Sequence, residues 1–89
     1  MIFVLSKRAQ ADIDNIARYT LDNFGPAQAE EYLSSLYNVL DLLADNPKFG
    51  REWTQGRRRY VYRSHYVYYR LAGGRVFITQ IRHTGQRPI

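Results

Sequence analysis

The chain has 89 residues, no cysteine, two histidines and a formal net charge of +5. This length accommodates one hydrophobic core, so we expect residues 1–89 to form a single domain. Without cysteine there is no disulfide, thiolate nucleophile or Cys-ligated zinc, and two histidines give little basis for a metal centre, so we expect neither a metal nor a cofactor.

The N-terminal segment, residues 2–5, is a short apolar run that predicts a buried strand. The segment lacks the basic residues in front and the small-residue cleavage site behind that mark a signal peptide. No run of the chain approaches the ~20 apolar residues that cross a membrane. We therefore expect a cytoplasmic protein that does not associate with membranes.

Ser6 is expected to cap a helix over residues 7–24. Apolar residues recur there at helical spacing and predict one buried stripe, formed by Ala9, Ile13, Ile16, Ala17, Thr20 and Phe24. The following Gly25 and Pro26 are typical of a helix end that leads directly into the next helix.

A second helix is predicted over residues 26–45, and Asn46-Pro47 ends it. Its buried face is predicted to consist of Ala29, Tyr32, Leu33, Leu36, Val39, Leu40 and Leu43. Because the connection between the two helices is so short, they should form an antiparallel hairpin. Neither helix buries its apolar stripe alone, so a sheet has to cover them.

A loop is predicted over residues 48–57, and three runs rich in Tyr, Val, Ile and Phe then predict strands over 58–63, 66–71 and 75–82. Ser64-His65 and Ala72-Gly73-Gly74 have the length of hairpin turns. The predicted order is β-α-α-β-β-β. This is an α+β fold, a helical hairpin packed on a mainly antiparallel four-stranded sheet.

The charges are distributed unevenly along the chain. All eight acidic residues lie in the first 52 positions, where five basic residues bring the sum to −3. From Trp53 onward there are eight arginines and no acidic residue, a sum of +8. Such a one-sided field attracts polyanions, so we expect a nucleic acid or an acidic protein segment as partner rather than a merely solvated arginine surface.

Residues 57–63 combine arginine with tyrosine and valine. Strand alternation would place Arg59, Val61 and Arg63 on one sheet face, and Arg58, Tyr60 and Tyr62 on the other. Arginines beside aromatic rings are typical of surfaces that bind RNA or single strands. Alternatively, the tyrosines pack the sheet and keep their hydroxyls at its rim. The arginines are the stronger functional candidates.

His83 follows Arg82 at the end of the last predicted strand. A histidine can act as a general acid or base because its pKa lies near neutrality. However, no acidic residue follows Glu52 in the sequence to orient the imidazole. We therefore favour a structural hydrogen bond at the strand end. The spacing shows no phosphate-binding glycine loop and no Ser/His/Asp arrangement.

Several short motifs follow one another along the chain: Leu5-Ser6, Ala9-x-x-Asp12-Ile13-x-x-Ile16-x-x-Tyr19, Phe24-Gly25, Gln28-Ala29-x-x-Tyr32-x-x-x-Leu36, Asn46-Pro47-x-x-Gly50-Arg51, Arg58, Tyr69-Arg70 and Ile78-x-x-Ile81-x-His83. In their order and spacing, the chain resembles the ParE/RelE toxin superfamily of type II toxin–antitoxin systems over essentially its whole length. The resemblance implies a toxin that an acidic antitoxin normally silences.

The two branches of this superfamily differ in mechanism: ParE-like members bind and poison DNA gyrase, whereas RelE-like members are ribosome-dependent mRNA endoribonucleases. The motifs of the first helix and of the loop after the second helix resemble ParE. RelE-like members typically carry an arginine three residues before the tyrosine that corresponds to Tyr69, a position held here by Tyr66. The resemblance thus implies a gyrase inhibitor and no catalytic residues. In an RNase, the catalytic candidates would be Arg59, Arg63, Arg82 and His83.

The resemblance to ParE also implies partners and contact sites. A ParD-like acidic antitoxin is expected to contact Tyr32, Leu36, Arg58, Tyr60 and Tyr68. DNA gyrase is the implied target, contacted through Arg82, His83, Gln86 and Arg87. The toxin–antitoxin complex would reach operator DNA through the antitoxin, and an inactive module that serves only this autoregulation is a further alternative.

Overall fold

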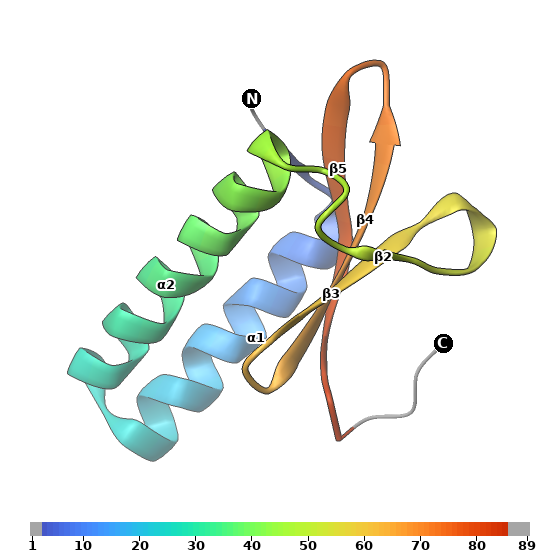
Figure 1. Cartoon of the computed structure of the whole chain (residues 1–89). Coiled ribbons are helices and arrows are strands. Elements are labelled where there is room, and N and C mark those ends of the chain that lie inside the picture. Colours follow the sequence, from blue (N-terminus) through green and yellow to red (C-terminus); the bar gives the residue numbers. More distant parts are fainter. Residues whose placement is uncertain (1–2, 86–89) are drawn as a thin grey trace.

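The computed structural model describes residues 3–85, in which two helices cover one face of a five-stranded sheet (Figure 1). The elements in chain order are β1 (Phe3–Leu5), α1 (Lys7–Phe24), α2 (Pro26–Asp45), β2 (Arg51–Glu52), a 3-10 turn (Thr54–Gly56), β3 (Arg58–Tyr62), β4 (His65–Ala72) and β5 (Arg75–His83). The predicted α+β fold with a helical hairpin on one face of the sheet is therefore confirmed.

Helix α1 begins where the sequence predicts it, because the Ser6 hydroxyl accepts a hydrogen bond from Ala9 N at 2.9 Å. Ala9, Ile13 and Thr20 are buried on the face that lies against the sheet. Phe24, predicted to belong to this stripe, is instead 64% exposed at the last helical position.

Helix α2 follows after a single residue, Gly25, whose φ of 89° reverses the chain direction at low steric cost. Pro26 occupies the first turn of α2, where no backbone N–H is required. Together α1 and α2 form the predicted antiparallel hairpin (Figure 1). Neither helix, nor any other helix within residues 3–85, is long and apolar enough to cross a membrane.

The sheet has the strand order β1-β5-β4-β3-β2. Only β1 pairs in parallel, with β5, and all other neighbours are antiparallel. The fifth strand, β2, lies inside the segment predicted as a loop and pairs through Arg51 and Glu52 with β3. Both of its side chains are exposed, so the sequence of β2 carries no buried alternation that could predict it.

The core lies between the helical hairpin and the sheet. Helices contribute Ala9, Ile13, Leu36, Leu40 and Leu43, and the sheet contributes Val67, Tyr69, Val76, Ile78 and Ile81. Because side chains alternate along a strand, the neighbours of these sheet residues point to the opposite side, which we call the open face. Figure 1 shows no helix on that side.

The turn between β3 and β4 differs from the predicted one. Tyr62 pairs with His65, so Arg63 and Ser64 form the turn instead of Ser64 and His65. Arg63 has a φ of 50° and therefore leaves the strand alternation. The prediction that Arg63 shares a face with Arg59 is wrong, because the Arg63 guanidinium turns to the helices and pairs with Glu31 at 3.2 Å.

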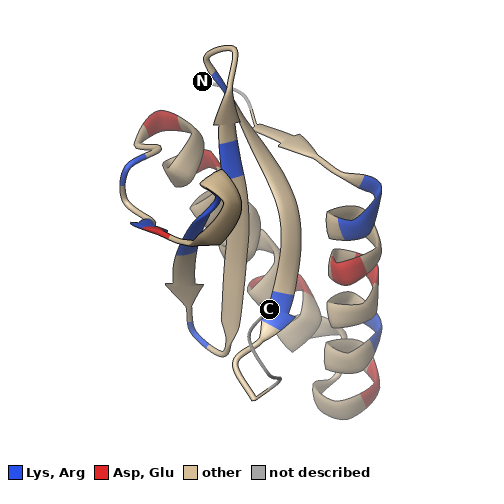
Figure 2. Ribbon diagram, turned by 90° about the vertical axis from the view of Figure 1, so that its right-hand side faces the viewer, with Lys and Arg blue, Asp and Glu red and all other residues tan. Residues whose placement is uncertain are grey.

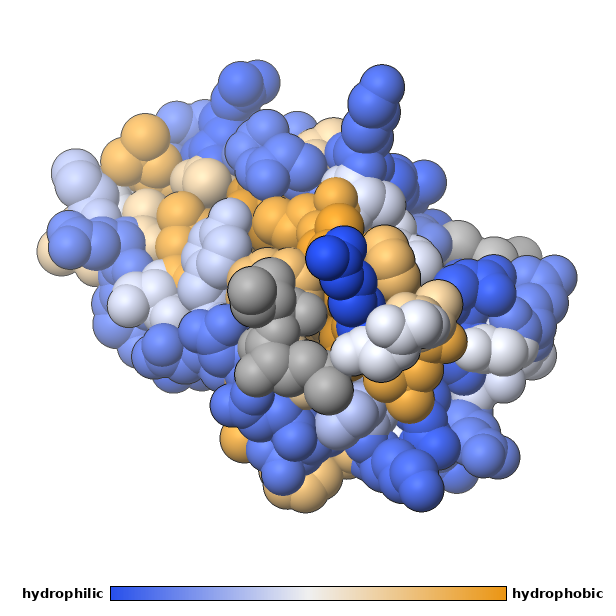
Figure 3. All heavy atoms as spheres, turned by 90° about the horizontal axis from the view of Figure 1, so that it is seen from above, coloured by the Kyte–Doolittle hydropathy of each residue, from blue (hydrophilic) through white to orange (hydrophobic). Residues whose placement is uncertain are grey.

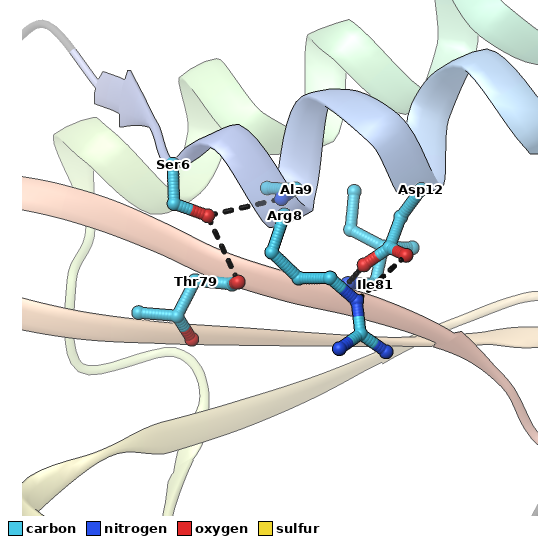
Figure 4. A network of polar contacts seen from close by, with 6 residues as sticks. All are labelled: Ser6, Arg8, Ala9, Asp12, Thr79 and Ile81. Carbon is cyan, nitrogen blue, oxygen red and sulfur yellow. Dashed lines mark hydrogen bonds and ion pairs between the residues drawn. The ribbon is translucent and has the colours of Figure 1, made fainter.

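A β-bulge at Thr79 interrupts the pairing of β5 with β4, since Tyr68 pairs with Gln80 and Tyr69 with Ile78. Beyond the end of β1, side chains at the start of helix α1 form hydrogen bonds with the backbone of β5 in place of a neighbouring strand (Figure 4). There, Ser6 Oγ donates to Thr79 O at 2.9 Å and Asp12 Oδ2 accepts from Ile81 N at 2.9 Å. These contacts give the Leu5-Ser6 and Asp12-Ile13 motifs a structural role.

The segment after α2 is fixed by Tyr69. The Tyr69 hydroxyl donates to Pro47 O at 2.7 Å and accepts from Gly50 N at 2.8 Å. A Cβ atom at position 50 would lie 2.7 Å from Tyr69 Cε1, so only glycine fits there. The backbone carbonyl of Gly50 in turn accepts from Arg58 Nη1 at 2.6 Å. The Asn46-Pro47-x-x-Gly50-Arg51 motif is therefore also structural.

Candidate partner-binding surfaces

Opposite charges occupy different parts of the molecule. Strands β3, β4 and β5 contain five arginines and no acidic residue, whereas the acidic residues other than Glu52 lie on α1 and α2 (Figure 2). Three arginines form ion pairs within residues 3–85: Arg8 with Asp12, Arg58 with Glu52 and Arg63 with Glu31. Their acidic partners lie on the helices or at the sheet edge, and none of these ion pairs involves Arg57 or Arg59.

A compact group of basic and aromatic side chains occupies the open face. We call it the open-face cluster, and it consists of Trp53, Arg57, Arg59, Tyr66 and Tyr68. Arg59 pairs with Tyr68 across β3 and β4, and Tyr68 pairs with Gln80 of β5. Trp53 and Arg57 come from the two ends of the segment between β2 and β3. Trp53 N donates a hydrogen bond to Arg57 O at 2.8 Å and so holds these ends together.

Each arginine of the open-face cluster lies over an aromatic ring. The Arg59 guanidinium is stacked 3.8 Å from the centre of the Trp53 ring and 4.3 Å from that of Tyr66. The Arg57 guanidinium lies 5.2 Å from the centre of the Tyr68 ring. The rings are therefore occupied by arginines of the same chain. This arrangement leaves them poorly placed to stack on nucleic acid bases.

Several polar atoms of the open-face cluster are buried without a partner. Tyr68 has no exposed surface and Arg57 is 9% exposed. Tyr68 Oη, Arg57 Nε and Arg59 Nε are buried and make no hydrogen bond within residues 3–85. Next to them, the Gln80 amide oxygen is placed to accept from Arg82 Nη1 at 3.1 Å and from Arg8 Nη2 at 3.2 Å.

A second candidate surface is a groove of about 870 Å³ between α1, the start of α2 and the ends of β4 and β5. We call it the histidine groove, because His65 and His83 line it with their rings 5.4 Å apart, edge to face. Tyr32 Oη lies 2.5 Å from His65 Nδ1. At the rim, Tyr19 and Phe24 are 63% and 64% exposed.

Burial lowers the pKa of His65 below its ordinary value, and the neighbouring His83 lowers it further. The acidic residue of the groove, Asp12, already accepts from Ile81 N and Arg8 Nε. It therefore does not serve to orient either imidazole. His83 Nδ1 accepts from Gly85 N at 3.0 Å, which is the structural hydrogen bond that we favoured from the sequence.

The structure does not bring the four ribonuclease candidates together. Arg59 and Arg82 project from the open face, His83 lines the histidine groove, and Arg63 lies in the turn beside α2. No set of three His, Cys, Asp or Glu side chains in the described part of the chain is arranged to bind a metal ion.

The residues predicted to contact an antitoxin lie in three places. Tyr32 lines the histidine groove and Tyr68 belongs to the open-face cluster, whereas Arg58 and Tyr60 are half-buried on the helix side of β3. Leu36 has no exposed surface and is part of the core, so its side chain offers no contact to a partner. Of the predicted target-binding residues, Gln86 and Arg87 lie outside the described residues.

Sequence reasoning missed two participants. Trp53 lies in the segment predicted as a loop, and its place over Arg59 depends on the unpredicted pairing of β2 with β3. His65 was expected to lie in a hairpin turn, but it is the first residue of β4 and lines the histidine groove. The tyrosine-rich pattern alone gave no signal for either contact.

Exposed apolar side chains come from several elements: both helices, the segment after α2, and the strands β3 and β4. They are Tyr19, Leu21, Phe24, Tyr37, Leu42, Phe49, Val61 and Leu71. In the view of Figure 3, hydrophobic groups alternate with hydrophilic side chains. Charge and hydrogen bonding therefore distinguish the candidate surfaces better than hydrophobicity does.

A family model described as the ParE toxin of the type II toxin–antitoxin system, parDE, matches residues 3–88. The chain belongs to the ParE toxin family. Toxin ParE1 of Mycobacterium tuberculosis is 36% identical over 85 residues, which cover 91% of this chain and 87% of that protein. Toxin ParE1 of Caulobacter vibrioides is 37% identical over 82 residues, covering 89% and 84%.

A solved structure of a chain of the chromosomal ParDE TA system from P. aeruginosa has the same fold, with a TM-score of 0.82. That chain is 22% identical, and the match covers 93% of this chain and 95% of the other. The predicted ParE-like branch of the superfamily is thus confirmed by the family model and by the relatives.

Proposed function

We propose that this ParE family toxin acts in the cytoplasm by binding and poisoning DNA gyrase, without itself catalysing a reaction. The observation that carries the proposal is the separation of Arg59, Arg63 and His83 onto three different surfaces. Cleavage of RNA needs an acid, a base and phosphate-binding groups within hydrogen-bond reach of one phosphate. A gyrase poison needs a binding surface only.

We assign the target contacts to the end of β5 and the segment that follows, through Arg82, His83, Gln86 and Arg87. Arg82 projects from the basic open face, and His83 lies beside it at the rim of the histidine groove. A positive surface of this kind favours approach to a protein that carries bound DNA.

The proposed inhibitor of the toxin is a cognate ParD-like antitoxin with an acidic segment, and the complex would reach operator DNA through that antitoxin. Tyr32, Arg58, Tyr60 and Tyr68 are the proposed contacts. The charge of +8 in the second part of the chain supports fast association with an acidic partner. Leu36 is left out because it is buried in the core.

The test is a gyrase cleavage assay with purified toxin, gyrase, plasmid and ATP. We expect linear, gyrase-bound DNA to accumulate and the antitoxin to prevent it. No cleavage product from a folded, antitoxin-binding toxin would overturn the proposal. Rapid translation arrest on expression would then favour a RelE-type endoribonuclease, and normal growth would favour an inactive module.

The target contacts are tested with the double substitution Arg82→Ala and Arg87→Ala. We expect loss of toxicity with antitoxin binding retained. The matched control is Arg75→Ala, which removes an exposed arginine at the far end of β5 and should leave toxicity unchanged. Undiminished toxicity of the double variant would show that the assignment is wrong.

A further inference from the structure

We propose that the open-face cluster is a binding site for a carboxylate group that belongs to an acidic peptide segment of a protein partner. The ligand is an aspartate or glutamate side chain held by Arg57, Arg59 and Tyr68. The identification of that partner with the antitoxin rests on the proposed function, whereas the carboxylate site itself does not.

The first argument is the set of unpartnered atoms. Tyr68 Oη, Arg57 Nε and Arg59 Nε are all hydrogen-bond donors, and none has an acceptor within residues 3–85. Buried donors without acceptors destabilise a protein. These three donors, on β3, on β4 and in the segment before β3, are explained if a ligand rich in acceptors completes the site. A carboxylate has about four lone-pair positions for such donors.

The second argument is charge. Arg58 and Arg63 each have an acidic neighbour, Glu52 at 3.6 Å and Glu31 at 3.2 Å. Arg57 and Arg59 have no acidic side chain within 4.0 Å among the described residues, although both are at least half-buried. Two guanidinium groups in one cluster without counter-charge attract an anion, and a planar guanidinium matches a carboxylate in shape.

The third argument separates a peptide from a nucleic acid. A single strand would stack its bases on exposed aromatic rings. Here the rings of Trp53 and Tyr66 hold Arg59 between them, and Tyr68 is fully buried beneath Arg57. The stacking fixes the Arg59 guanidinium in place, so little side-chain entropy is lost when it binds a carboxylate.

The segment Thr54–Gly56 directly precedes Arg57 in the chain, and its movement would expose the buried Tyr68 hydroxyl to a ligand. Its three residues are exposed, and Gln55 and Gly56 both have positive φ values, 60° and 72°. Its turn is closed by Arg57 N donating to Thr54 O at 3.2 Å. A shift of this small turn, together with the Arg57 side chain, would bring Tyr68 Oη into contact with the ligand.

The test uses a hexaglutamate peptide as probe and follows the side-chain Nε–H signals of arginine by NMR. We expect saturable shifts of the Arg57 and Arg59 signals, and no response to hexaglutamine. Arg59→Gln should weaken binding at least about tenfold, because it removes a bidentate contact. The matched control Arg75→Gln removes the same charge at an exposed position and should weaken binding less than about twofold.

The substitution Tyr68→Phe tests whether the Tyr68 hydroxyl serves ligand binding or the stability of the fold. Because it removes only a hydroxyl that has no partner within residues 3–85, the folded protein should lose no stability in urea unfolding. Binding of hexaglutamate should nevertheless fall severalfold. Equal loss in Arg59→Gln and Arg75→Gln, undiminished binding in Tyr68→Phe, or tighter saturable binding of hexathymidylate would each overturn the proposal. None of these outcomes bears on gyrase poisoning, which the cleavage assay tests separately.

Discussion

Asp12 on helix α1 and Ile81 on strand β5 are joined by a hydrogen bond of 2.9 Å from the Ile81 backbone N–H to Asp12 Oδ2. The contact lies where β1 has ended and β5 would otherwise expose an unpaired edge. Asp12 Oδ1 also pairs with Arg8 at 3.1 Å (Figure 4). The Asp12 carboxylate therefore has a structural role, because it attaches helix α1 to strand β5.

Replacing Asp12 with alanine should lower the free energy of unfolding by about 2 kcal/mol, because a backbone donor loses its charged acceptor. Urea denaturation measures this change. Asp14→Ala is the matched control, since Asp14 is exposed and its carboxylate accepts, among the residues that the structure describes, only from Gln10 Nε2. The control should change stability by less than about 0.5 kcal/mol. Equal effects in the two variants would contradict the structural role of Asp12.

Gly50→Ala should destabilise the protein by about 2 kcal/mol, because the added methyl group would overlap the Tyr69 ring. Tyr69 cannot give way easily, since it is buried and its hydroxyl bonds to Pro47 O and Gly50 N. Thermal and urea unfolding both report the loss. A variant with unchanged stability would mean that Tyr69 has room to move.

Stability should decrease as the pH falls below about 6.5, the ordinary pKa of histidine. The folded state keeps His65 neutral because burial lowers its pKa, so the unfolded state binds the proton first. The groups facing His65 are Tyr32, Ser64 and His83. His65→Gln should flatten this part of the pH profile, measured by urea unfolding between pH 7.5 and pH 5.5. Parallel profiles for the two proteins would refute the assignment.

Gln55→Gly should raise stability by up to about 1 kcal/mol, because Gln55 adopts a φ of 60° that costs a side-chain-bearing residue more than glycine. Its side chain is exposed, so no contact is lost. Thr54→Gly, at the neighbouring position with ordinary backbone angles, should instead lower stability slightly. The two variants measure the strain of the turn that adjoins the open-face cluster.

The helices were predictable because their signals are local. Ser6, Gly25-Pro26 and Asn46-Pro47 mark their ends, and both helices have the predicted bounds. The strands β3, β4 and β5 were predicted to within one residue. Strand β2 was not, because two exposed residues without alternation carry no pattern.

The candidate site was predictable only in part. Arg59 and Tyr68 stood out in the sequence as a basic and an aromatic residue of neighbouring strands, but their pairing depends on register. The contact of Arg59 with Trp53 depends on β2, and the orientation of Arg63 depends on a positive φ that arginine seldom adopts. Strand register and rare backbone conformations cannot be predicted from the residues that are neighbours in the sequence.

Strand β5 lies between β1, the first strand made, and β4, and it provides Val76, Ile78 and Ile81 to the core. During synthesis, both helices therefore leave the ribosome before the strand that covers them exists. The parallel pairing of β1 with β5 joins residues that are far apart in the sequence, and contacts of such long separation form slowly. The binding surfaces formed by β4 and β5 exist only after both of these strands have been synthesised, so a chain that is interrupted before β5 lacks them.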